Sequence, residues 1–172
     1  MKKLLAILLA VVMVISMATV ASAANTTTLT TSVPAATYTL NIPADQVIPF
    51  GATETDLGMP TVSASAGFAK GKNLQVTVTY EDFKNESVST TIHCSLRAVP
   101  NAGASLSLLS GSALTFYGKD DGSVDEIAGW KENSNFRTLQ RLSLEVSSSN
   151  WGKALAGEYT TTIIFSAEVV AQ

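Results

Sequence analysis

Residues 73–83 read Asn-Leu-Gln-Val-Thr-Val-Thr-Tyr-Glu-Asp-Phe, and apolar and polar side chains alternate along them. The alternation puts four apolar side chains on one face of an extended chain, namely Leu74, Val76, Val78 and Tyr80. A period of two residues is typical of a β-strand that packs one face against a core. This stretch therefore predicts a strand of an all-β fold, and it is the clearest such pattern in the chain.

Weaker alternation recurs on both sides of this stretch, with turn residues between the segments. We expect strands over 33–42, 46–50, 57–65, 87–99, 138–147 and 158–170, and a hairpin over 104–117 that turns at Ser110-Gly111. Residues 24–172 contain 19 Thr, which favours strands, and 17 Ser, which favours turns. The pattern predicts a two-sheet antiparallel β-sandwich, Ig-like or fimbrial-like, of eight or nine strands. A closed barrel is the competing architecture.

The N-terminal residues have the pattern of a secretory signal peptide. Lys2 and Lys3 precede an apolar run over 4–20, and Ala21-Ser22-Ala23 supplies the small residues that signal peptidase accepts. We expect cleavage before Ala24, in the manner of a bacterial export signal; the alternative is an uncleaved membrane anchor. The predicted organisation is a signal peptide over 1–23, a Thr-rich lead-in over 24–37 and one β-sandwich domain over 38–172. The predicted location is secreted or at the cell surface, with no permanent membrane span after cleavage.

The charge and the scarcity of His and Cys exclude several function classes. Without Lys2 and Lys3, nine basic residues face fourteen acidic ones, a net charge of −5. A mildly acidic chain is a poor nucleic-acid partner, because phosphates require a basic patch. His93 and Cys94 are the only residues of their types, which excludes a zinc site of the usual Cys and His type and an intramolecular disulfide.

The residues around His93 do not form a recognisable catalytic motif. His93 and Cys94 are neighbours on a predicted strand and point to opposite faces, so they cannot act as a dyad. Ser95 is about 7 Å from His93 on a flat strand, too far for a hydrogen bond. We therefore predict a protein that is not an enzyme, with His93 exposed and Cys94 a buried, inert thiol.

An acidic loop over 118–126 is the one candidate for a cation. Asp120, Asp121 and Asp125 offer carboxylates to a weak calcium site, while Asp-Gly at 121–122 is equally a common turn dipeptide. No other cofactor is expected.

Two tryptophans are candidates for ligand binding. Trp130 and Trp151 fall in predicted loops, where exposed rings can stack on sugars. The alternative is that both rings fill the open ends of the sandwich, because large aromatic side chains are mostly buried.

The C-terminal third carries a family resemblance. Leu142-Ser143-Leu144-Glu145-Val146, Trp151, and Ala156-Gly157-Glu158-Tyr159-Thr160-Thr161-Thr162-Ile163-Ile164-Phe165 resemble the closing hairpin of WxL-type and fimbrial-subunit-like surface proteins of Gram-positive bacteria. The Trp-x-Leu tripeptide itself is absent, since Gly152-Lys153 follows Trp151. The resemblance covers about 30 residues and implies a secreted β-sandwich.

These patterns together predict an exported, non-enzymatic cell-surface or extracellular matrix protein, an assembly or adhesion subunit. The alternative is a carbohydrate- or protein-binding module that uses the loops around Trp130 and Trp151. The expected partners are other copies of the chain, cell-wall or surface proteins, or carbohydrate. The segment Asn25–Tyr38, which has no charged side chain, is further expected to pair with a sheet edge of its own chain or to donate a strand to a neighbour. The alternative is that it is a disordered tail.

Overall fold

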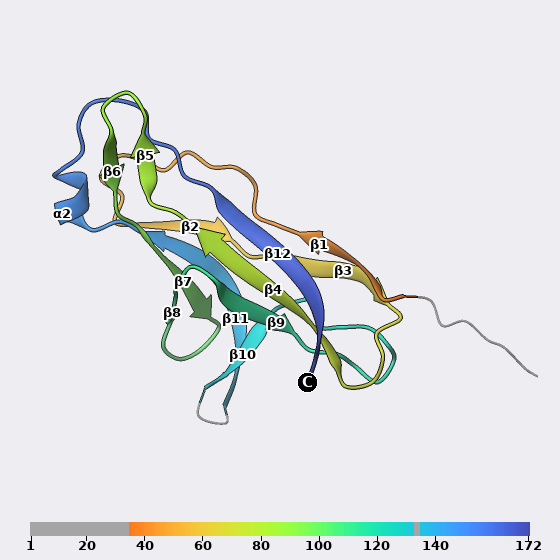
Figure 1. Ribbon diagram of the computed structural model, residues 1–172. Helices are drawn as coiled ribbons and strands as arrows, with labels where there is room; N and C mark the ends of the chain where they lie inside the picture. The colour runs from red at the N-terminus through yellow and green to blue at the C-terminus, as the bar shows by residue number, and fades with distance from the viewer. Residues whose placement is uncertain (1–34, 133–134) are drawn as a thin grey trace, which may run out of the picture. The chain divides into compact units, whose positions relative to one another are not determined.

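The computed structural model describes residues 35–132 and 135–172, and these residues form antiparallel β-sheets with almost no helix (Figure 1). The strands are β1 (Thr37–Asn41), β2 (Glu54–Gly58), β3 (Thr61–Ala66), β4 (Lys72–Tyr80), β5 (Phe83–Asn85), β6 (Thr90–Ile92), β7 (Ser95–Pro100), β8 (Leu106–Leu108), β9 (Ser112–Phe116), β10 (Gly129–Glu132), β11 (Asn135–Glu145) and β12 (Ile163–Ala171). A single helical turn, α2 (Ser148–Trp151), separates the last two strands. The all-β prediction is confirmed.

The largest sheet follows the order β12-β4-β9-β10-β11-β7-β8, and β2 also pairs with β11. Strands β1 and β3 form a second sheet, and β5 and β6 form a third. Strand β11 joins two groups of strands, because its first residues pair with β10 whereas Leu142–Glu145 lies between β7 and β2. Both groups contribute side chains to one hydrophobic cluster.

Strand β4 confirms the strand that the alternation over 73–83 predicts. Leu74, Val76 and Val78 are fully buried between neighbours on both sides, β12 and β9. Burial of each of these side chains stabilises the fold by about 2 kcal/mol. The hydroxyl of Tyr80 donates to the Leu108 carbonyl at 2.9 Å, so the polar end of this inward residue is also paired.

The described residues contain more strands than the eight or nine predicted, because several expected strands are broken. β2 ends at Gly58, whose φ is +84°, and Met59 and Pro60 separate it from β3, where one strand was expected over 57–65. Likewise 87–99 divides into β6 and β7, because the Cys94 N–H donates to the Asp82 carboxylate at 3.0 Å rather than to a neighbouring strand.

Two predicted hairpins are not paired as expected. Strand β8 pairs with β7, whereas β9 pairs with β4, so the segment 104–117 crosses between strand groups instead of folding on itself. The last two strands, β11 and β12, do not pair with each other either, since β12 pairs with β4. Hydrophobic faces of sequence-adjacent strands are thus buried against different partners.

The predicted signal peptide over 1–23 and most of the lead-in lie outside the described residues. Thr37, the last residue of the lead-in, begins β1, and β1 pairs with β3 of the same chain. Among the described residues no helix is long and apolar enough to span a membrane.

Candidate functional site

An apolar groove of about 710 Å³ opens beside the edge strands β12 and β2. Its walls come from β2, α2, the irregular segment 42–50 that connects β1 to β2, the start of β12 and the more polar residues 157–162 before it. The apolar lining includes Ile48, Phe50, Leu57, Trp151, Ile163 and Phe165. Pockets of this size and composition accommodate small molecules or alternate side chains of an extended peptide.

The segment 42–50 does not close the groove by forming a strand. Pro43 and Pro49 have no N–H to donate to a ladder, so the strand expected over 46–50 does not form. Val47 is 93% exposed and Phe50 is 79% exposed, so two large apolar side chains stand in solvent at the groove. This local exposure is unusual beside a groove whose own lining is apolar.

Trp151 is held at the groove by its hydrogen bond and by a neighbouring ring. Ser147 caps α2 by accepting the Asn150 N–H, and the next residue is Trp151. The indole Nε1 donates to the Ala52 carbonyl at 2.8 Å, and the Phe50 ring packs edge-on with centroids 5.3 Å apart. Trp151, chosen from the sequence as a ligand-binding residue, therefore lines a pocket; its binding role stays a prediction.

The inner face of β12 is only half covered where it borders the groove. Phe165 is partly buried, whereas its partner on β4, Val78, is fully buried. The difference arises because β12 has a paired strand on one side only. Within the described residues, nothing pairs with its outer edge, which leaves backbone groups available to another chain.

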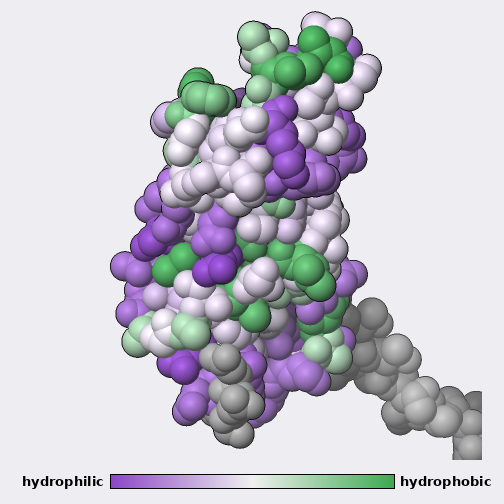
Figure 2. Space-filling model, turned by 90° about the vertical axis from the view of Figure 1, so that its left-hand side faces the viewer, coloured by the Kyte–Doolittle hydropathy of each residue, from purple (hydrophilic) through white to green (hydrophobic). Residues whose placement is uncertain are grey.

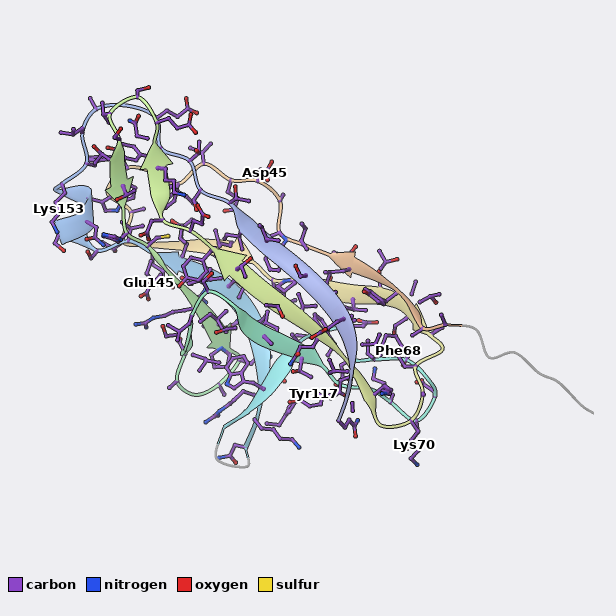
Figure 3. The ribbon with its side chains drawn as sticks, viewed as in Figure 1. Asp45, Phe68, Lys70, Tyr117, Glu145 and Lys153 are labelled. Carbon is purple, nitrogen blue, oxygen red and sulfur yellow. The ribbon has the colours of Figure 1, made fainter. Side chains whose placement is uncertain are left out.

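The charged residues at the groove are both acidic. Asp45 lies on the connecting segment, at the upper edge of Figure 3, and Glu158 lies on the approach to β12. Neither carboxylate forms an ion pair with any described residue, and no basic side chain lines the groove. The groove therefore favours an apolar occupant that carries positive charge.

Trp130 lies away from the groove. It sits in β10, inside the segment expected to be a loop, and its cross-strand partner is Arg137. Its ring is partly buried against the core, and β10 and α2 are well separated in Figure 1. The structure thus does not bring the two tryptophans together as one binding surface.

The acidic loop folds as a turn whose carboxylates already have partners. Asp121 accepts the Ser123 N–H at 2.9 Å and its hydroxyl at 2.6 Å, and these hydrogen bonds lower the pKa of the carboxyl. Asp120 pairs with Lys70 at 3.4 Å, and Asp125 with Lys119 at 3.4 Å. A calcium ion would have to compete with these contacts. No cluster of three potential ligands occurs in the described part of the chain, and calcium binding stays a prediction.

A small polar pocket of about 260 Å³ surrounds His93 and Cys94. The exposed His93 has its Nδ1 2.5 Å from Asp82 Oδ2, a pair eleven residues apart that the sequence analysis missed. Cys94 is a free thiol and half-buried rather than buried. Burial, followed by the nearby Asp82 carboxylate, raises its pKa to about 11, so the thiol resists ionisation.

Apolar residues also gather elsewhere on the surface. Figure 2 shows them at the tip of the molecule and across its middle, at the level of β7 and β8. Large apolar side chains that are exposed include Val88 between β5 and β6, Leu106 in β8 with Leu109 just after it, and Leu155 between α2 and β12. The groove combines a concave, largely apolar lining with the free edge of β12.

Comparison with protein-family models, with curated proteins and with solved structures finds no match.

Proposed function

We propose that the chain is an exported, non-enzymatic subunit of a cell-surface or extracellular assembly, built on an Ig-like or fimbrial-like β-sandwich. The observation that carries the proposal is the open apolar groove beside the unpaired edge of β12. A sheet edge next to an unfilled apolar groove offers both hydrogen bonds and side-chain pockets to an added segment. The signal-peptide pattern over 1–23 supports export.

The groove is an assembly surface rather than a defect of the core, because its exposed residues are large and apolar. Val47 and Phe50 lie in solvent in the separate chain, and both are available to a partner. Burying side chains of this size at an interface contributes about 2 kcal/mol each before the cost of association.

Sedimentation velocity over a roughly hundredfold range of concentration tests the proposal, because association depends on mass action. We expect wild-type oligomers at high concentration, and we expect Val47→Lys to weaken association, because it places a positive charge in a groove that favours a positively charged occupant. The matched control is Leu109→Lys, since Leu109 is 74% exposed and does not line the groove. A wild type that is monomeric throughout would refute assembly. If both variants weaken association to the same extent, the groove is not the interface.

A second candidate is a carbohydrate-binding module, favoured by the edge-to-face pair of Phe50 and Trp151. The exposed Phe50 ring offers a face on which a sugar can stack. Retention on a panel of immobilised polysaccharides tests this function. Binding that Phe50→Ala abolishes, in a protein that stays monomeric, would replace assembly by glycan recognition.

A further inference from the structure

We infer that the groove receives, from a second copy, the cross-strand pair of Lys131 on β10 and Phe136 on β11. The inference rests on the proposed assembly function and names the segment that enters the groove. We call this pair the knob. Its parts are an aromatic ring and an ammonium group, which match an apolar groove with acidic charge.

The knob is compact because its two residues are direct partners in the ladder. Lys131 pairs with Phe136 in the β10–β11 register, so both side chains project from the same face of the hairpin. Phe136 is 50% exposed and Lys131 is exposed as well. Lys131 has no ion-pair partner among the described residues.

The local packing holds the Phe136 ring in place. A side chain at Gly129 would lie 2.5 Å from the ring, so the missing side chain leaves room for the aromatic group. The Tyr117 ring packs edge-on against Phe136 with centroids 5.2 Å apart. A ring fixed in this way loses little conformational freedom when a partner covers it.

The groove complements the knob in charge and in chemistry. Asp45 and Glu158 supply negative charge without an internal partner, and Phe50 and Trp151 supply aromatic surface.

The positions of knob and groove determine the kind of assembly. In Figure 1 the strands β10 and β11 lie at the lower side, whereas the segment 42–50 runs along the upper side and α2 lies at the upper left. Contact between different surfaces at opposite sides of a molecule does not close into a symmetric dimer. Such contacts form rings or open chains of subunits.

Complementary charge reversal tests the inference by sedimentation velocity. Lys131→Glu alone and the double variant Asp45→Lys/Glu158→Lys alone should each raise the dissociation constant by about tenfold or more, because like charges then face each other. An equimolar mixture should assemble again, because the altered hairpin fits the altered groove and the remaining hairpin and groove are unchanged. Restored assembly also demonstrates that both variants are folded.

The other outcomes separate the inference from the proposed function. If the wild type assembles but the mixture does not, the knob is wrong and assembly through the groove stands. If deletion of 24–32 abolishes assembly while Lys131→Glu preserves it, the lead-in is the occupant and the inference is refuted. If the wild type never associates, both proposals fail. Raising the salt concentration should weaken the wild-type contact, since exposed charges are screened.

Discussion

Gly157 occupies a position that no other residue fits, and replacing it by alanine should destabilise the fold strongly. Its φ of +147° is a conformation that residues with a side chain rarely adopt. An added Cβ would overlap the Nδ2 atom of Asn85, which is only 4% exposed. The Asn85 side chain cannot easily turn away, because its Oδ1 accepts the Ser87 N–H at 3.0 Å.

The expected cost combines two effects. Backbone strain at such a conformation costs about 1–3 kcal/mol. Overpacking against a buried side chain adds about 1–3 kcal/mol, and a shift of the loop before β12 would reduce this second cost. We expect the free energy of unfolding of Gly157→Ala to fall by about 3 kcal/mol in urea denaturation. The corresponding fall in Tm is roughly 6–12 °C for a domain of this size.

Gly152→Ala is the matched control. Gly152 follows α2 with a helical φ of −65°, and an added Cβ would make only ordinary contacts, the nearest at 3.5 Å from the Ser148 carbonyl. This variant should stay within about 0.5 kcal/mol of the wild type or gain slightly. In an Asn85→Ala background the cost of Gly157→Ala should shrink, since the overlapping atom is gone. Equal stability of Gly157→Ala and Gly152→Ala would refute the reasoning.

Three further predictions use different measurements. Tyr80→Phe removes the hydrogen bond to the Leu108 carbonyl, so the free energy of unfolding should fall by about 1 kcal/mol in urea denaturation; no change would mean that water replaces the hydroxyl. Because the pKa of Cys94 is raised to about 11 in the folded protein, the thiol should react slowly at pH 8 and quickly once unfolded. The free energy of unfolding should also fall between about pH 9 and 11, because in that range the thiol has lost its proton only in the unfolded chain. A labelling rate that does not change with pH would contradict the raised pKa. The intact mass of the exported protein should correspond to a chain that begins at Ala24, and a mass that retains Lys2 and Lys3 would disprove cleavage.

The sequence predicted those features that depend on local periodicity. Strand β4 and its three buried aliphatic residues follow from alternation within nine residues. The same rule failed at 46–50, where Pro43 and Pro49 were the available sign that no ladder could form. The order of the strands could not be predicted from local patterns, because the consecutive strands β8 and β9 pair with different strands, β7 and β4.

The candidate site depends on contacts between residues distant in the sequence. The Trp151 indole reaches a carbonyl 99 residues earlier, and Phe50 was not selected because an aromatic residue near a proline carries no pattern of its own. The pairing of Asp82 with His93 requires the turn between β5 and β6. Likewise, Lys131 faces Phe136 only in the register that the β10–β11 ladder fixes.

The continuity of β11 has a consequence for how the molecule unfolds. Its eleven residues pair with β10 at one end and with both β2 and β7 at the other, so neither strand group separates without breaking ladders of this strand. The two groups should therefore melt in one cooperative transition, and the amides of Leu142 and Leu144, flanked by strands on both sides, should exchange with deuterium only on global opening. Under a stretching force β11 would carry load between the two strand groups, because both are hydrogen-bonded to it.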